Sequence, residues 1–354
     1  MIVFLIIHGE AHHKRHLSEA MLRVYMRWLL LSLVSAGLLS FGGCASRPDK
    51  PVALETALSR GTAIPIKMSF TEGGLILLED VKINGLSFDF IMDTGATQSA
   101  IFKSSLEQLD LNLTSYEDTM VHGMMQSKQH RLVNIPNFEI GSIQFLIKSM
   151  VVLEDRDLGI GQSIDYDGLI GMDVLSNYHI YVSPELGEMS FISNTSHIFV
   201  PNHWRRVELL ENPFLADNRD LHFIELRVDG RLTPAIVDTG AEFNAMNWSS
   251  ASFSQAKYVK KRLREGWELQ GAVGTFEPVV KVTMELVRSG QRFWRDKDFI
   301  IMDFNSLAVL GITDEPFIIA GMKLFSDETL FMDFERNYIA MEPKRRNSQT
   351  GFSE

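Results

Sequence analysis

The sequence predicts an all-β chain made of two similar β-barrel lobes with a cleft between them. Two observations predict this fold class. Apolar and polar residues alternate around tight-turn dipeptides, as they do in β-hairpins. One such hairpin pattern also occurs twice along the chain, at a constant offset. An internal duplication of this kind implies two lobes related by a pseudo-two-fold axis.

The repeated pattern is a hairpin that leads into Asp-Thr-Gly-Ala. The first copy spans residues 81–96 and the second spans 226–241, so that the offset is 145 residues. In the first copy, Asn84-Gly85 is a dipeptide that tolerates positive φ at both positions of a tight turn. In the second copy, Pro234 lacks an N–H group and therefore predicts an edge strand or a bulge.

A second landmark follows each Asp-Thr-Gly-Ala motif. Two apolar residues precede Gly171 in the first copy and Gly321 in the second, which places the landmarks 150 residues apart. We expect each landmark to lead into a pair of strands. A weaker match relates Gly123 to Gly271, and both lie between the aspartate and the landmark glycine of their copy.

Composition limits the classes of function. The 354 residues suffice for two domains, and 45% hydrophobic with 22% charged residues is an ordinary globular balance. The net charge of −11 argues against nucleic acid as a partner, because phosphate binding needs clustered Lys and Arg. The single cysteine, Cys44, excludes a disulfide within the chain and a zinc site built from several thiolates.

The first 44 residues have the character of an export leader. An apolar run over 28–43 follows Arg23 and Arg27 and is short for a transmembrane helix. Its end resembles a bacterial lipobox, which implies lipid attachment at Cys44. A plain signal peptide and an uncleaved helical anchor remain alternatives. The expected organisation is a leader (1–44), a polar tether (45–62), an N-terminal lobe (63–200), a C-terminal lobe (201–345) and a tail (346–354).

Two Asp-Thr-Gly turns at matching points of a repeat suit one kind of chemistry. Two carboxyl groups about 3 Å apart cannot both ionise, so they share one proton. The ionised member can take a proton from water while the neutral member polarises a carbonyl group. The glycine lets the backbone approach the carboxyl, and the threonine hydroxyl can form a hydrogen bond across the pair.

With these motifs, residues 63–345 resemble the aspartic proteases, specifically retropepsin-like enzymes joined as two lobes in one chain with the acid-protease fold. The resemblance implies that Asp93 and Asp238 form the catalytic dyad. It assigns Gly171 and Gly321 to the strand behind each active loop, and it places candidate flaps near Gly123 and Gly271. The supporting loop residues that it implies are Thr94, Gly95, Ala96, Thr239, Gly240 and Ala241.

The function expected from this resemblance is that of an aspartic endopeptidase without a metal or other cofactor. Its substrate would be a peptide or protein lying extended between the lobes. Because one chain supplies both aspartates, dimerisation is not required. The leader predicts a bacterial cell-envelope location, lipid-anchored and facing the periplasm. Ala45 and Ser46 after the cysteine resemble the start of lipoproteins sent to the outer membrane. The alternatives are a catalytically inactive peptide-binding lipoprotein of the same fold and a scaffold lipoprotein that holds envelope partners.

The fourth residue of each motif predicts the pH dependence. Ala96 and Ala241 carry no hydroxyl that could donate to the neighbouring carboxylate and favour its ionisation. We therefore expect an activity optimum at mildly acidic to near-neutral pH.

Overall fold

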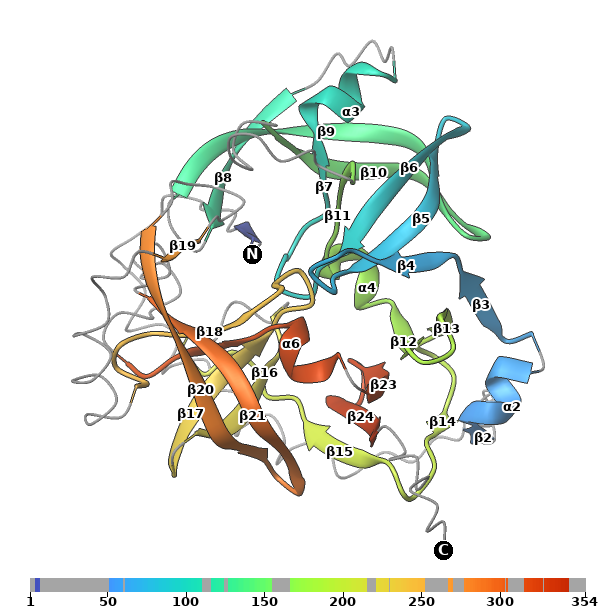
Figure 1. Cartoon of the computed structure of the whole chain (residues 1–354). Helices are drawn as coiled ribbons and strands as arrows, with labels where there is room; N and C mark the ends of the chain where they lie inside the picture. The colour runs from blue at the N-terminus through green and yellow to red at the C-terminus, as the bar shows by residue number, and fades with distance from the viewer. Residues whose placement is uncertain are drawn as a thin grey trace, which may run out of the picture. The chain divides into compact units, whose positions relative to one another are not determined.

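The computed structural model describes residues 4–6, 51–59, 61–109, 116–123, 127–154, 166–214, 221–228, 230–251, 267–269, 277–302, 304, 315–326 and 328–343. Strands dominate these residues, and the helices among them are short (Figure 1). The predicted all-β class with an internal duplication is confirmed.

The first lobe is a nine-stranded sheet in the order β1-β8-β9-β10-β7-β11-β6-β5-β4. A further pairing of β9 with β5 connects distant parts of the sheet. Its strands are β1 (Phe4–Ile6), β4 (Met68–Phe70), β5 (Ile76–Ile83), β6 (Leu86–Met92), β7 (Ala100–Phe102), β8 (Tyr116–Gly123), β9 (Ser127–Ile140), β10 (Ile143–Leu153) and β11 (Gly168–Ile170). Two short helices, α3 (Lys103–Glu107) and α4 (Met172–Leu175), accompany them.

The second lobe repeats this plan in a seven-stranded sheet, β16-β17-β22-β18-β21-β20-β19, in which β16 also pairs with β20. Its strands are β16 (Phe223–Val228), β17 (Arg231–Val237), β18 (Asn244–Met246), β19 (Trp267–Leu269), β20 (Glu277–Ser289), β21 (Arg292–Ile301) and β22 (Ile318–Ala320). Helix α6 (Met322–Phe325) follows its landmark glycine, as α4 follows Gly171 in the first lobe.

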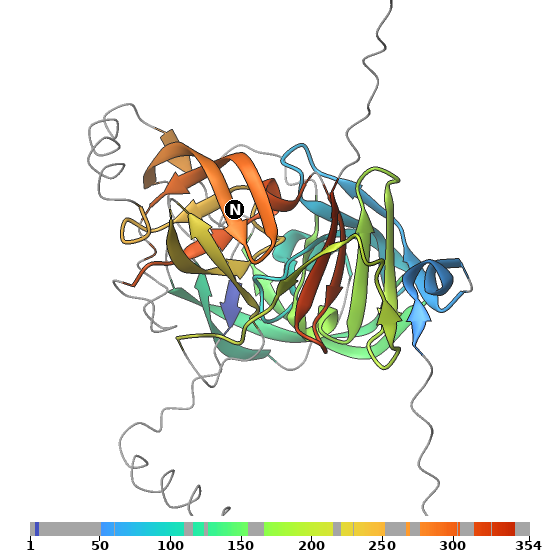
Figure 2. The same cartoon turned by 90° about the horizontal axis from the view of Figure 1, so that it is seen from below.

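A six-stranded sheet joins the lobes in the order β15-β24-β23-β12-β13-β3. Its strands are β3 (Ala63–Ile66), β12 (Tyr178–Ser183), β13 (Glu188–Ser193), β15 (Arg205–Glu208), β23 (Glu328–Asp333) and β24 (Tyr338–Pro343). Figure 2 shows the red strands β23 and β24 beside the yellow-green strands β12 and β13. Each half of the chain therefore contributes to one continuous sheet.

The register at the centre of this sheet locates the pseudo-two-fold axis. Tyr181 of β12 pairs with Phe331 of β23, and the two positions are 150 residues apart, the same offset as the landmark glycines. On either side, Ile180 pairs with Met332 and Val182 pairs with Leu330. Exchanging the two halves maps this pairing onto itself, so the axis passes between Tyr181 and Phe331.

The sequence patterns correspond to local structure at the first hairpin. Asn84 and Gly85 have φ of 49° and 84°, the positive values that the β5–β6 turn requires. On the return strand, Phe88 and Phe90 are buried while Leu86 is exposed. Strand β6 then leads directly to Asp93 on a fully buried Ile91-Met92 pair. The hairpin thus fixes where the first aspartate emerges.

The stretch expected to be a polar tether differs from that prediction over residues 51–59. Here β2 (Val52–Ala53) pairs with β14 (Ile198–Phe199), and α2 (Leu54–Ser59) buries Leu54 and Ala57 in a small core. Apolar residues within a polar stretch explain the difference, because a short helix can bury two of them on one face. Strand β1, inside the expected leader, pairs with β8.

Candidate active site

Both aspartates follow the buried strand that ends each repeated hairpin. Strand β6 runs parallel to β11, and the Asp93 N–H donates to the Ile170 carbonyl at 2.9 Å. In the second lobe β17 runs parallel to β22, and the Asp238 N–H donates to the Ala320 carbonyl at 3.0 Å. Both side chains are fully buried. The landmark strand thus holds each aspartate by its backbone.

The structure brings the two carboxyl groups together. They lie within hydrogen-bonding reach of each other. In each loop the glycine N–H donates to Oδ1 of its own aspartate at 2.9 Å, from Gly95 to Asp93 and from Gly240 to Asp238. A Cβ atom added to either glycine would collide with the carboxyl of the opposite lobe. Only glycine permits this close approach.

The surroundings disfavour ionisation of both carboxyls. Burial raises the pKa of Asp93 to about 7. Burial and the neighbouring Asp93 carboxyl raise the pKa of Asp238 well above its usual range. Among the described residues, no donor reaches Oδ2 of either aspartate. A single proton held between the carboxyls satisfies both conditions, since two adjacent charges in a buried site are costly.

The two threonines connect the active loops across the axis with four hydrogen bonds. Thr94 N–H donates to Thr239 Oγ1, and Thr239 N–H donates to Thr94 Oγ1, both at 3.0 Å. Thr94 Oγ1 donates to the Val237 carbonyl at 2.8 Å, and Thr239 Oγ1 donates to the Met92 carbonyl at 2.7 Å. Each hydroxyl thus bonds both the Asp-Thr-Gly loop of the opposite lobe and the strand that leads into that lobe's aspartate.

The landmark glycines lie directly behind the loops. A Cβ at Gly171 would approach the Ala96 carbonyl oxygen to 2.8 Å, and one at Gly321 would approach the Ala241 carbonyl oxygen to 2.7 Å. The residue after each glycine donates its N–H to the same carbonyl, from Met172 to Ala96 and from Met322 to Ala241, at 2.8 Å in both lobes. Ala96 and Ala241 are fully buried.

Two residues at this site were not predicted from the sequence. Ser99 Oγ accepts the Gly171 N–H at 3.1 Å, and Asn244 Oδ1 accepts the Gly321 N–H at 3.1 Å. The positions are 145 residues apart, the offset of the motifs themselves. A short polar residue lies six positions after each aspartate. This shared position was the sequence signal that could have identified Ser99 and Asn244 as part of the site.

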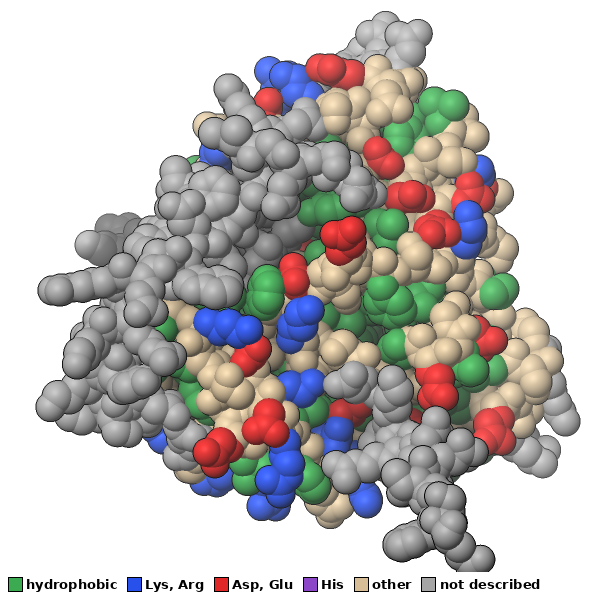
Figure 3. Space-filling view, viewed as in Figure 1, with side chains coloured by type: hydrophobic (Ala, Val, Ile, Leu, Met, Phe, Trp, Pro, Cys, Tyr) green, Lys and Arg blue, Asp and Glu red, His purple; other side chains and the backbone are tan. Residues whose placement is uncertain are grey.

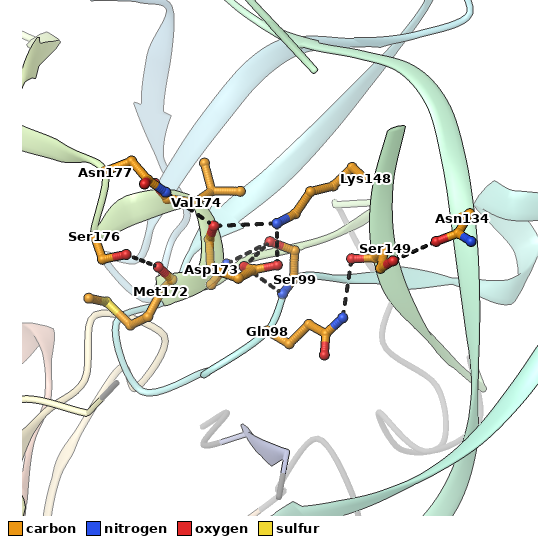
Figure 4. A network of polar contacts seen from close by, with 11 residues as sticks. Gln98, Ser99, Asn134, Lys148, Ser149, Met172, Asp173, Val174, Ser176 and Asn177 are labelled. Carbon is orange, nitrogen blue, oxygen red and sulfur yellow. Dashed lines mark hydrogen bonds and ion pairs between the residues drawn. The ribbon is translucent and has the colours of Figure 1, made fainter. Parts of the chain in front are cut away.

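In the first lobe Ser99 also belongs to a wider polar network (Figure 4). Its hydroxyl donates to Asp173 Oδ1 at 2.7 Å, and Lys148 forms an ion pair with Asp173. Burial raises the pKa of Asp173, and Lys148 opposes this effect. In the second lobe, Lys323 stands at the Asp173 position and lies 3.8 Å from Glu242 of the active loop. The two loops therefore have different electrostatic support.

Of the other positions predicted from the sequence, the structure describes only Gly123. Gly123 ends β8, which pairs antiparallel with β9, and its place in a flap stays a prediction. Gly271 and Cys44 lie outside the described residues. Among the described residues, no cluster of three or more His, Cys, Asp or Glu could hold a metal ion. The described part of the chain contains no helix of the length and hydrophobicity that crossing a membrane requires.

Comparison with known proteins finds a family model that matches part of the chain. Residues 79–174, which contain Asp93 and Gly171, match the aspartyl protease family model. Among the solved structures that match is conglutin gamma, a basic 7S globulin from lupine seeds. It has 10% sequence identity and a TM-score of 0.44, and the match covers 79% of this chain and 94% of that chain. No curated protein matches the chain.

Proposed function

We propose that the protein is an aspartic endopeptidase that hydrolyses peptide bonds with a water molecule activated between Asp93 and Asp238. The observation that carries the proposal is the pairing of two fully buried carboxyls whose pKa values are both raised. The family match over residues 79–174 supports the assignment for the first lobe. The repeated motif extends it to the second.

The chemistry follows from one shared proton. The ionised carboxyl accepts a proton from water as the water oxygen attacks the scissile carbonyl carbon, and the neutral carboxyl donates its proton to the carbonyl oxygen. The carboxyl that took the proton from water then donates it to the leaving nitrogen, and the other carboxyl accepts a proton from a hydroxyl of the tetrahedral intermediate as its C–N bond breaks. The dyad again holds one proton. Because water is the nucleophile, no covalent intermediate with the enzyme forms. The glycine N–H donors hold each Oδ1 in place while the proton moves.

The substrate, location and assembly also belong to the proposal. The substrate is a peptide or protein segment in extended conformation, because backbone pairing is how strands accept such ligands. The leader, with Cys44 at its end, supports export and lipid anchoring in a bacterial envelope, facing the periplasm. The dyad needs no second copy of the chain, because both aspartates come from one molecule.

The test is cleavage of a mixed peptide library by the purified chain, followed by mass spectrometry. We expect Asp93→Asn and Asp238→Asn each to reduce kcat/KM by at least about 10³-fold, because the amide can neither share nor transfer the proton. Asp80→Asn is the matched control, since Asp80 is an exposed aspartate paired with Lys82. Its activity should equal that of the unchanged chain.

The same assay separates the enzyme from its alternatives. Cleavage that persists in either dyad variant would refute the dyad. Peptide binding without cleavage by the unchanged chain would instead favour the inactive peptide-binding lipoprotein. If the unchanged chain neither binds nor cleaves any peptide, the scaffold lipoprotein is the alternative that remains.

A further inference from the structure

The two lobes differ at the outer edges of the six-stranded sheet. In the first lobe, the β9–β10 turn lies against β3: a Cβ at Gly141 would be 3.1 Å from the Pro65 carbonyl oxygen. The corresponding β20–β21 turn contains Gly290, with a similar φ of 52°. No atom of the described residues lies within 4 Å of a Cβ placed there. The second-lobe turn therefore does not pack against its sheet edge at Gly290 as the first-lobe turn does at Gly141.

The strand registers identify which residues correspond at these edges. Ile66 of β3 pairs with Met189, and Val207 of β15 pairs with Ile339, which is 150 residues beyond Met189. By this register, Arg206 occupies the place of Pro65. By the same register, Arg205 occupies the place of Ile64, which packs beside the first-lobe turn.

This exchange changes the hydrogen-bonding capacity of the edge. Proline on an edge strand offers no N–H to an incoming strand, which is a common protection of sheet edges. On β15, the Leu209 N–H donates to the Asn337 carbonyl of the chain leading into β24. Alternation along an antiparallel strand then directs the backbone groups of Arg206 and Glu208 away from β24. Among the described strands, β24 is the only partner of β15.

A groove of about 710 Å³ lies between this edge and the β20–β21 turn. Trp204, Arg205 and Arg206 line one side, and Ser289 to Gln291 line the other. Phe199 adds an apolar surface that is 55% exposed. Leu210, whose N–H and C=O both bond Phe223, closes the free edge. The open part is thus a short strand edge beside a groove that a peptide backbone can enter.

The charges in the groove favour an acidic side chain at one end. Arg205 has no ion-pair or hydrogen-bond partner among the described residues, and its proximity adds to burial in lowering the pKa of Arg292. An anion here would relieve that repulsion. Glu208 and Glu225 line the groove as well, toward the Leu210 end of β15. Lys and Arg side chains, with Asp and Glu side chains among them, lie in the lower part of the face seen in Figure 3, near β15 and the β20–β21 tip.

We propose that the free edge of β15 binds an extended segment of a partner protein by strand addition, with an acidic side chain of that segment opposite Arg205. Backbone hydrogen bonds at Arg206 and Glu208 would supply the pairing, and Arg205 would select the acidic residue. This site lies outside the proposed dyad and does not depend on hydrolysis.

The test uses two fluorescently labelled peptides with blocked ends, Thr-Val-Glu-Val-Glu-Val-Thr and its counterpart with Lys at both Glu positions. Binding is measured by fluorescence polarisation to the full chain carrying Asp238→Asn, so that neither probe can be cleaved. We expect the acidic peptide to bind below about 1 mM and at least about tenfold more tightly than the basic one. Arg205→Glu should weaken the acidic peptide at least about tenfold, and Arg205→Lys should retain most of its binding.

The sheet edge itself is tested at Arg206. Arg206→Pro places at this edge the proline that the first lobe already accommodates at Pro65, and we expect it to abolish binding without loss of folding. Arg206→Ala is the matched control, because it keeps the backbone N–H. Thermal melting of each variant verifies the fold, and Arg295→Glu, an exposed arginine outside the groove, should bind like the starting chain.

Each other outcome overturns the proposal. Equal binding of both peptides, no binding of the acidic one, or binding that Arg205→Glu and Arg206→Pro leave unchanged would place the ligand elsewhere. A dimer in sedimentation that Arg206→Pro dissolves would show that a second copy of the chain covers this edge instead.

Discussion

At the scale of single residues, the two buried aspartates oppose folding at neutral pH while the groups around them support it. Ionising Asp93 or Asp238 in the protein interior is unfavourable, as their raised pKa values show. The glycine donors on each Oδ1 recover part of that cost. The hydrogen bonds from neighbouring groups, and not the two carboxyls themselves, therefore stabilise this site in the folded chain.

This balance predicts a stability change at Asp93. Its pKa of about 7 in the folded chain exceeds the unfolded value of about 3.9, so the folded chain binds more protons between these values. Stability therefore falls as pH rises from about 4 to 7. We expect Asp93→Asn to raise the free energy of unfolding at pH 7 by about 1–3 kcal/mol, measured by urea denaturation. A destabilised variant at pH 7, with no gain over its value at pH 4, would contradict this.

The alanines beside the dyad predict the pH profile. Ala96 and Ala241 are buried, and neither offers a hydroxyl to the carboxylates. We expect the optimum of kcat/KM at mildly acidic to near-neutral pH, and we expect Ala96→Ser to move the acidic limb lower by up to about one unit. The measurement is a pH–rate profile of both chains. A peak below about pH 3 in the unchanged chain would refute the interpretation.

At the scale of elements, the loops depend on the threonine pair that joins them. Thr94 and Thr239 each accept one backbone N–H and donate to one carbonyl, and all of these groups are buried. Removing one hydroxyl leaves a donor and an acceptor without partners. Because an unpaired buried group costs more free energy than a hydrogen bond contributes on average, losing this contact should destabilise the fold by more than the net value of its hydrogen bonds.

Replacing one threonine tests this role. We expect Thr239→Val to lower the free energy of unfolding by about 2–6 kcal/mol, because it leaves one buried N–H and one buried carbonyl without a partner at about 1–3 kcal/mol each. Thr239→Ser keeps the hydroxyl and should lose only about 1 kcal/mol with its methyl group. Denaturant titration measures both. Equal losses in the two variants would show that the methyl packing, and not the hydroxyl, holds the loops.

Sequence patterns predicted where strands and turns occur better than they predicted which strands lie side by side in the sheets. The hairpins, both Asp-Thr-Gly-Ala turns and both landmark glycines follow from local alternation and a constant offset. Pro234 shows the limit, because β17 lies between β16 and β22 and is not an edge strand. Its pairing with β22 begins only at Ala235, so Pro234 needs no donor on that side. Which strands flank a residue depends on parallel pairings far along the chain, which alternation does not encode.

At the scale of the whole molecule, the lobes share a sheet and a core. Strands β12 and β23 pair across the axis, and one hydrophobic cluster contains residues of both halves, including Phe90 and Phe299. Residues 51–59 also pack into the fold, which their composition did not reveal because only Leu54 and Ala57 are buried there. The asymmetry at β15 escaped prediction for a similar reason, since it depends on how a turn meets an edge.

The shared sheet predicts cooperative unfolding. We expect the chain with Asp238→Asn, which cannot cleave itself, to show one calorimetric transition, because neither half can expose its side of the sheet alone without losing the core. The measurement is differential scanning calorimetry with the calorimetric and van't Hoff enthalpies compared. Two separable transitions, only one of which responds to Thr239→Val, would show that the lobes unfold independently.

The most direct test is a titration of the two carboxyl carbons by nuclear magnetic resonance. The chain is labelled with ¹³C at its aspartate carboxyls, and the signals are assigned with Asp93→Asn and Asp238→Asn. The account predicts two coupled ionisations far apart in pH, with one proton retained to about pH 7. In Asp93→Asn the pKa of Asp238 should fall because the neighbouring carboxyl is gone, and it should stay above its usual range because burial remains. Two independent ionisations near pH 4 would contradict a shared proton and, with it, the proposed hydrolysis.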